Sequence, residues 1–325
     1  MTQHDDNARK CSIADALNFY EANFEAAGQW ILEAGSKVVL KRADGLHICR
    51  FCGRSDAEVT FETVAHALPE ALGNKSLFSE YECDECNGQF GRTIESDFGT
   101  WSQPMRTMMR IKGKNGVPTM AKGSRDGWRI EYKESRLKVT ARESDPIFQV
   151  DEANRQVTFT LRRDPHTPIA VLKTFWKMAL TVMSEQDVAE YAHALAWLRA
   201  PHAPTGLAQI PVFRTFVPGP LPNDKIAIQL LRRKSDDIAV PYMYFILMYA
   251  NEMFQVALPA VGRDAHLDGK TTTIPFYPTP YDLLDAWPFG QTQRGPLFLS
   301  GAEVVPVKTF PLTMSYDSIG DNETP

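Results

Sequence analysis

Four of the five cysteines in this 325-residue chain stand in two Cys-x-x-Cys pairs, and no other feature of the sequence constrains the fold as strongly. One such pair lets two thiolates bind an ion from a single turn of chain. Two pairs brought together make a closed tetrahedral site for a structural Zn²⁺, with Zn–S distances of about 2.3 Å. The sequence therefore predicts one zinc ion per chain, held by Cys49, Cys52, Cys83 and Cys86.

A histidine and two asparagines accompany the cysteine pairs. His66 stands 17 residues before the second pair, Asn74 lies between the pairs, and Asn87 follows the second pair directly. In this order, roughly residues 44–101 resemble the zinc-stapled HNH endonucleases, which are ββα-metal nucleases. The resemblance implies that His66 is the general base and that Asn87 is a ligand of a catalytic Mg²⁺ or Mn²⁺. It also implies that Asn74 pins the loop over the base.

The sequence departs from the family pattern at residue 65. The family carries an acidic second metal ligand just before the catalytic histidine, and this chain has Ala65 there. Glu95 is the first candidate to replace it, although on one continuous helix it would lie ~12 Å beyond Asn87 along the axis. Two alternatives to a replacement carboxylate remain. Either Asn87, water and the substrate phosphate alone hold the ion, or the module no longer cleaves. The other candidate carboxylates are Glu62, Glu70 and Glu82.

The net charge of −5 conceals a basic segment directly after this module. Residues 104–177 carry 16 Lys or Arg against 8 Asp or Glu, and residues 104–125 carry six basic side chains and no acidic one. Phosphate neutralisation requires such a band, while a solvated surface is the alternative. Trp128 and Tyr132 either stack on bases or pack in the core. The predicted nucleic-acid contacts are Arg106, Arg110, Lys112 and Lys114.

The remaining pattern predicts an α+β protein in three parts. These are an N-terminal helix within residues 1–35, the HNH module at 36–103, and a larger α+β domain with antiparallel strands at 104–320. Hydrophobic periodicity and turn residues set the individual elements. They predict a helix from Ser12 to near Gly35, a strand at Val59–Val64, a helix at Asp84–Phe98, a strand at Met105–Ile111, a helix at Pro168–Met183 and a buried strand at Tyr242–Tyr249.

The N-terminus has no signal-like apolar core, and no run of 18 apolar residues occurs, so the sequence predicts a cytoplasmic protein without a membrane partner. The lone Cys11 argues against a disulfide framework.

These features together favour a metal-dependent endonuclease acting on double-stranded DNA, with structural Zn²⁺ and catalytic Mg²⁺ or Mn²⁺. Its C-terminal domain would select the target or regulate activity, by analogy in restriction or phage defence. The alternative is a catalytically lapsed zinc module that binds nucleic acid. A homodimer and a small-molecule or protein regulator stay open as further partners.

Overall fold

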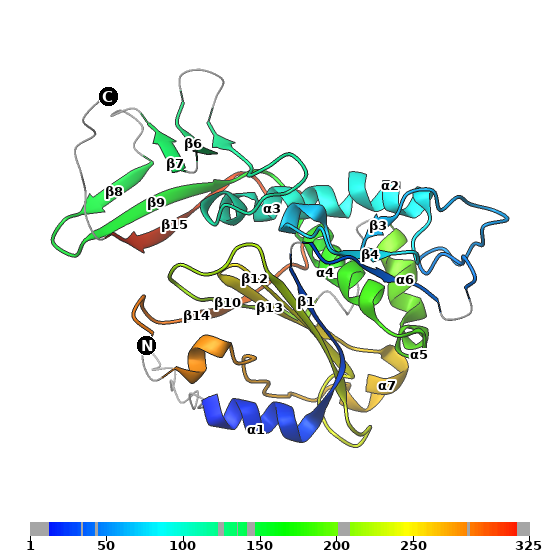
Figure 1. The fold of residues 1–325 in the computed structure, drawn as a ribbon. Coiled ribbons are helices and arrows are strands. Elements are labelled where there is room, and N and C mark those ends of the chain that lie inside the picture. The colour runs from blue at the N-terminus through cyan, green and yellow to red at the C-terminus, as the bar shows by residue number, and fades with distance from the viewer. Residues whose placement is uncertain are drawn as a thin grey trace.

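The computed structural model describes residues 13–33, 35–42, 45–122, 127–134, 136–141, 147–200, 209–284 and 287–316. Helices and antiparallel sheets are both present, which confirms the predicted α+β class (Figure 1). Cys11 and Ser12 lie outside the described residues. Among the described helices, none combines the length and apolar character needed to span a bilayer.

A six-stranded antiparallel sheet is the largest unit of the fold, with strand order β1-β11-β12-β13-β10-β14. All residues of β13 and all but one of β12 are buried, because helices and loops cover both faces of the sheet. The buried strand predicted at Tyr242–Tyr249 is thereby confirmed as β12. The strands are β1 (Phe24–Leu32), β11 (Ile226–Arg233), β12 (Met243–Tyr249), β13 (Glu252–Leu258), β10 (Val212–Phe216) and β14 (Gln293–Leu297).

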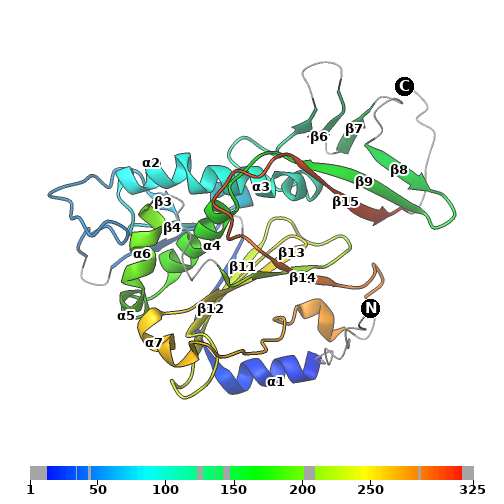
Figure 2. The same ribbon diagram turned by 180° about the vertical axis from the view of Figure 1, so that it is seen from behind.

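The N-terminal segment differs from the expected single helix. Helix α1 (Ile13–Asn23) ends well before Gly35, and the chain continues as β1, which pairs with β11. Pairing with β11 favours a strand in the second half of the segment, and so does its local composition, which includes Gly28 and the β-formers Trp30 and Ile31. Figures 1 and 2 show α1 on the sheet face opposite the one covered by α4.

The cysteine-rich segment forms a small sheet and two helices. Its three strands have the order β2-β4-β3. Two predicted strands are wrong, because residues 59–64 form no strand and residues 105–108 belong to helix α3. The elements are β2 (Val38–Leu40), β3 (Ala65–His66), η1 (Glu70–Leu72), β4 (Leu77–Ser79), α2 (Asp84–Arg92) and α3 (Ile94–Met108).

Helix α4 (Pro168–Val182) joins this segment to the large sheet, and every one of its residues is buried. A helix that is apolar on nearly all sides belongs in the centre of a core, as predicted for Pro168–Met183. Its Phe175 ring lies 5.4 Å from that of Phe98 on α3 and 5.0 Å from that of Phe254 on β13. The helix therefore lies between the cysteine-rich segment and the sheet (Figure 1).

Two small sheets project from the far end of α3 in Figures 1 and 2. One has the order β5-β6-β7 and the other β15-β9-β8, and both are antiparallel. Their strands are β5 (Met120–Ala121), β6 (Arg129–Lys133), β7 (Arg136–Thr140), β8 (Phe148–Asp151), β9 (Gln156–Arg163) and β15 (Lys308–Ser315). The other short elements are α5 (Glu185–Val188), η2 (Ala189–Tyr191), α6 (Ala192–Arg199), α7 (Val261–Asp264), η4 (Ala265–Leu267) and η5 (Pro280–Leu283).

Candidate functional site

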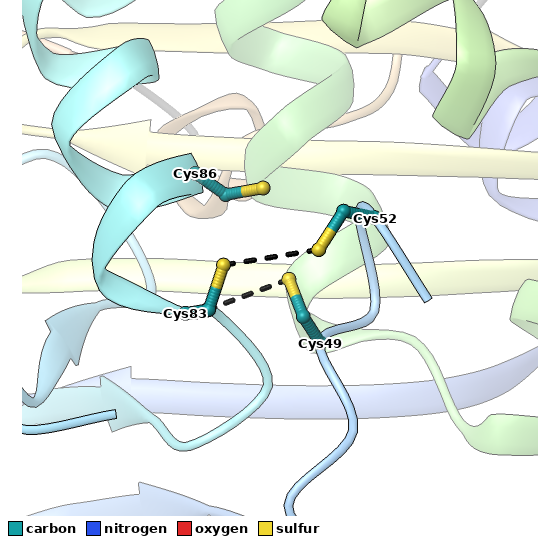
Figure 3. A group of neighbouring side chains, drawn as sticks. All are labelled: Cys49, Cys52, Cys83 and Cys86. Carbon is teal, nitrogen blue, oxygen red and sulfur yellow. Dashed lines mark hydrogen bonds between the residues drawn. The ribbon is translucent and has the colours of Figure 1, made fainter. Parts of the chain in front are cut away.

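Two short pieces of chain bring the four cysteines together (Figure 3). Cys49 and Cys52 lie on a tight turn in which the Gly53 amide donates to the Cys49 carbonyl at 2.7 Å. Gly53 has a φ of +74°, in the left-handed region that residues with side chains disfavour. Cys83 is the N-cap of α2, and Cys86 lies in its first turn. A glycine-closed turn thus presents one pair, and a helix N-terminus presents the other.

The sulfur geometry fits a zinc ion. All four Sγ atoms lie within 4.8 Å of one another, and Sγ of Cys52 is 3.8 Å from Sγ of Cys83. Tetrahedral Zn–S bonds of about 2.3 Å space the sulfurs by roughly 3.8 Å. Cys52 is half-buried and the other three cysteines are buried. The cluster is therefore arranged as a closed, structural zinc site.

Three thiols of the cluster have pKa values shifted by their neighbours and by burial. The hydrogen bond with Cys86 lowers the pKa of Cys49 to about 4, and the same contact raises the pKa of Cys86. Burial raises the pKa of Cys83 to about 11. Four thiolates in one buried place require a cation, so zinc binding releases protons and weakens as the pH falls.

Asp84 ties the chain that precedes His66 to α2. Its carboxylate accepts hydrogen bonds from Thr60 Oγ1 at 2.5 Å and from the amides of Glu62 at 2.9 Å and Thr63 at 2.8 Å. These donors, Thr60 first, lower the pKa of Asp84 to about 2. These hydrogen bonds to Asp84 replace the strand-to-strand hydrogen bonds that were expected for residues 59–64. Sequence reasoning missed this role of Asp84, because it took the residue only as the start of the predicted helix at Asp84–Phe98.

His66 ends β3 and is paired with Phe78 of β4, whose ring centroid lies 4.8 Å from that of the imidazole. Burial lowers the pKa of the half-buried His66 below its ordinary value of 6.5. The neutral ring that results is the form that accepts a proton. The carboxylates of Glu70 and Glu95 act to raise this pKa. The ammonium groups of Lys177 and Lys114 act to lower it.

Asn74 is buried and uses both ends of its side-chain amide inside one loop. Nδ2 donates to the carbonyls of Leu68 at 3.0 Å and Leu77 at 2.8 Å. Oδ1 accepts from the amides of Ser76 at 3.1 Å and Leu77 at 2.9 Å. The side chain therefore closes the connection between β3 and β4 and has no polar atom left for a substrate.

Asn87 is half-buried in α2, one residue past the second cysteine pair. The backbone amide of Asn87 donates to the Cys83 carbonyl at 2.9 Å, which fixes the residue in the first turn of the helix. The cysteine cluster and the first turn of α2 thus set the position of Asn87 relative to β3, which carries His66.

The expected single helix over Asp84–Phe98 is broken at Thr93, whose φ and ψ are −115° and −97°. Helix α2 ends at Arg92 and α3 begins at Ile94. Glu95 therefore lies in the first turn of a new helix, and its axial distance from Asn87 is not that of one continuous helix.

Lys177 of α4 binds two glutamates on either side of the second cysteine pair. Its Nζ lies 2.9 Å from Oε2 of Glu82 and 2.8 Å from Oε1 of Glu95. The side chains of Lys177 and Glu82 are 1% and 0% exposed, whereas that of Glu95 is 19% exposed. Burial acts to lower the pKa of Lys177, but the two carboxylates outweigh it and raise this pKa, so the ammonium stays charged.

The carboxylates considered as a second metal ligand lie in different surroundings. Glu62 is exposed, in the chain that Asp84 clamps. Glu82 is fully buried, and burial raises its pKa to about 7. Glu70 is half-buried in η1. Glu70 and Glu95 are the two whose charge acts on the pKa of His66.

Arg106 departs from its expected role as a nucleic-acid contact. It is 8% exposed, and its guanidinium donates to Ser102 Oγ at 3.0 Å and to the carbonyls of Ala71 and Gly99 at 3.3 and 2.7 Å. This placement corrects the prediction, because the guanidinium joins α3 to the turn at η1 and is not presented to a phosphate.

The other three predicted contacts, Arg110, Lys112 and Lys114, are exposed. They follow α3 on a loop that packs against η1, where a Cβ built on Gly113 would lie 3.3 Å from Cα of Ala71. This packing explains why Lys114, far from His66 in sequence, acts on the pKa of that ring.

Two cations that join the module to α4, Lys177 and Arg50, were not identified from the sequence. Arg50 lies between Cys49 and Cys52, and one of its guanidinium nitrogens donates to the carbonyls of Leu180, Thr181 and Met183 at 2.7, 2.9 and 3.0 Å. Arg50 therefore caps the C-terminal end of α4. The one available signal for Lys177 was that lysines lie inside a largely apolar helix, since a buried charge needs a partner.

Comparison with protein families matches residues 49–101 to the HNH endonuclease family. No curated protein and no solved structure matches the chain significantly. The matched segment contains both cysteine pairs, His66, Asn74, Asn87 and Glu95. Residues 49–101 are therefore an HNH endonuclease module, built around four cysteines arranged as a zinc site.

Proposed function

We propose that this protein is a metal-dependent endonuclease that hydrolyses phosphodiester bonds of DNA, with His66 as the general base. The observation that carries the proposal is the half-buried His66, whose pKa is lowered by burial. The charges of Glu70, Glu95 and Lys114 lie close enough to act on this pKa. A neutral imidazole takes the proton of the attacking water, and the strand pairing with β4 holds the ring in place.

The HNH family implies a divalent cation, which when bound stabilises negative charge on the leaving oxygen. Among the described residues, the four cysteines form the one cluster of three or more His, Cys, Asp or Glu side chains suited to an ion. A catalytic Mg²⁺ or Mn²⁺ would therefore rest on few protein groups, which fits a donor set of Asn87 and one carboxylate. Oxygen donors of this kind suit such hard cations.

Glu95 is the carboxylate that best supplies the ligand missing at Ala65. Lys177 holds its Oε1 at 2.8 Å, which fixes the side chain and leaves the second oxygen free of that contact. Glu95 is partly exposed and acts on the pKa of His66, whereas Glu82 is sealed in the core. Glu70, in the turn between β3 and β4, is the second choice.

The exposed Arg110, Lys112 and Lys114 are suited to guide a phosphate backbone toward His66. The proposal assigns target selection or regulation, as in restriction or phage defence, to the C-terminal region. The contacts of α4 with the module support such a link, because Lys177 holds Glu95 and the Arg50 side chain caps the end of the same helix.

A plasmid cleavage assay with Mg²⁺ or Mn²⁺ tests the proposal. His66→Ala should lower the rate by ~10²–10⁴, the usual contribution of positioned proton transfer, with zinc content and melting temperature retained. The matched control is His47→Ala in the same module, because His47 is exposed and packs beside Phe61 at a centroid distance of 5.5 Å. Undiminished cleavage by His66→Ala contradicts the assignment. DNA binding by a wild-type protein that never cleaves would favour the lapsed module instead.

A further inference from the structure

A cavity of about 430 Å³ opens beside the loop that follows His66. Four parts of the chain meet there: the loop at Gly73–Ser76, the end of α3 with its following loop, strand β6, and the facing ends of β1 and β11. The loop at residues 73–76 contains Asn74, which closes the connection between the two strands of the HNH site. The cavity therefore borders the loop that joins β3 to β4, but it is formed largely by residues outside the HNH module.

The walls of the cavity combine positive charge with one aromatic ring. Lys75, Arg110 and Lys112 line it, all three are exposed, and none forms an ion pair with another described residue. Of the two acidic residues in the lining, Glu33 is already paired with Lys225 at 2.7 Å, and Asp224 is the other.

The aromatic wall is Tyr132 of β6, which is half-buried. Trp128, the other aromatic residue considered for base stacking, is 6% exposed and belongs to the core. Of the two, Tyr132 is therefore the ring that a ligand can reach.

The backbone at Arg110 adopts a left-handed conformation next to the cavity. Arg110 follows the end of α3 with a φ of +60°, a conformation that glycine adopts far more readily at a helix end. Asn223, itself a lining residue, donates from Nδ2 to the Met109 carbonyl at 2.9 Å and holds this strained turn. An arginine is thus kept where glycine would be less strained, and its side chain lines the cavity.

We propose that this cavity binds one nucleotide of the nucleic-acid strand, with its phosphate at Lys75, Arg110 and Lys112 and its base stacked on Tyr132. This proposal rests on the proposed nuclease function. The volume exceeds what a bare phosphate needs, and a lining that contains both an aromatic ring and cations suits a base joined to a phosphate. A base can stack on Tyr132 only when it has left the double helix, so the cavity selects an unpaired nucleotide next to the cleavage site.

The test measures binding in the His66→Ala protein, so that cleavage does not interfere. A single-stranded oligonucleotide carrying one 2-aminopurine reports total binding by anisotropy and stacking by loss of fluorescence. Quenching should persist in Tyr132→Phe, because a planar ring is retained, and disappear in Tyr132→Ala, with affinity about 5–150-fold weaker in the latter. Phe298→Ala, at a side chain 71% exposed and outside the cavity, is the matched control and should change neither signal.

The charged wall gives a second test that does not depend on β6 folding correctly. The double variant Lys75→Ala/Lys112→Ala should weaken binding and flatten its salt dependence, because fewer counterions are released. Lys270→Ala, at an exposed lysine outside the cavity lining, should leave the salt slope unchanged.

Three outcomes would overturn the proposal. The first is normal oligonucleotide binding without any change in 2-aminopurine fluorescence, which leaves the nuclease function standing. The second is binding of free AMP, but not of inorganic phosphate, that is lost in Tyr132→Ala, while oligonucleotide binding is the same with and without Tyr132. The cavity would then bind a free nucleotide and not a nucleotide of the strand. The third is failure of the wild-type protein to bind or cleave any nucleic acid, which removes the proposed function as well.

Discussion

The cysteine cluster and the His66 site belong to the same HNH module, but they are held in opposite ways. The cluster is built from two short pieces of chain whose turns are closed by their own backbone hydrogen bonds. The His66 site depends on distant residues, because Glu95 is held by Lys177 of α4 and Lys114 comes from beyond α3. A closed metal site can thus be specified by local spacing, whereas the proposed catalytic site around His66 relies on the surrounding tertiary structure.

The largest expected effect tests the local half of this comparison. Cys83→Ser should remove one of four thiolates and with it most of the zinc affinity, which contributes about 10–16 kcal/mol in small zinc modules. We expect zinc content to fall below one ion per chain and the melting temperature to drop sharply. Elemental analysis and thermal unfolding measure this, with Cys11→Ser as the control outside the pairs. Unchanged melting of Cys83→Ser would mean that the module does not need its zinc.

The next effect tests how far the module that carries the proposed catalytic site depends on α4. Lys177→Met leaves Glu82 buried without its cation, which typically costs about 3–5 kcal/mol in the free energy of unfolding. Denaturant unfolding measures the loss. The double variant Lys177→Met/Glu82→Gln should recover part of it, because no buried carboxylate then lacks a partner. A loss equal in both variants would instead assign the cost to packing around the lysine stem.

A smaller effect is expected for the carboxylate itself. If Glu95 is a metal ligand, Glu95→Gln should raise the concentration of Mg²⁺ or Mn²⁺ that cleavage needs by about 10–100-fold, the range seen when groups supporting a metal are removed. Titration of cleavage rate against metal concentration measures it. Mn²⁺ should rescue better than Mg²⁺, since it binds such sites more tightly. Unaltered metal dependence would move the assignment to Glu70, and Glu70→Gln is the matched comparison.

The smallest effect concerns the pH profile. Burial lowers the pKa of His66 below 6.5, so the neutral base should persist as the pH falls through that value, and cleavage should decline only at lower pH. Lys114→Ala removes a positive charge and should move this acid limb to higher pH, while Glu70→Gln removes a negative charge and should move it lower. Each shift should stay within about one pH unit, the usual spread of such values. Shifts of the opposite sign would show that another group sets the limb.

The sequence was informative where one local pattern decides the outcome. The cysteine spacing located the metal cluster, and the apolar runs located α4 and β12. It failed where a distant partner decides, as when pairing with β11 converts residues 24–32 from the expected helix into β1. The break at Thr93 was also missed, because Gly91, two residues before it, lies in a helical pattern in which a single glycine does not by itself end a helix.

The same limit applies within the site. The resemblance to HNH endonucleases proposed His66, Asn87 and Glu95, but it did not indicate that Lys177 holds Glu95, since the two residues are 82 positions apart. Sequence reasoning also assigned Arg106 to the nucleic-acid surface, although this guanidinium is used inside the fold. Charge counted along the chain does not separate exposed cations from buried ones.

The ion pair between Lys177 and Glu95 also sets an order of events during synthesis of the chain. The two cysteines that approach at 3.8 Å are 31 positions apart, so the metal cluster can close soon after the second pair is made. Lys177 is translated 82 residues after Glu95, a delay of roughly 4–16 s at about 5–20 residues per second. The nascent module can therefore close its cysteine cluster before the Glu95 side chain is fixed, and the proposed nuclease site is completed only when α4 has been made and packed.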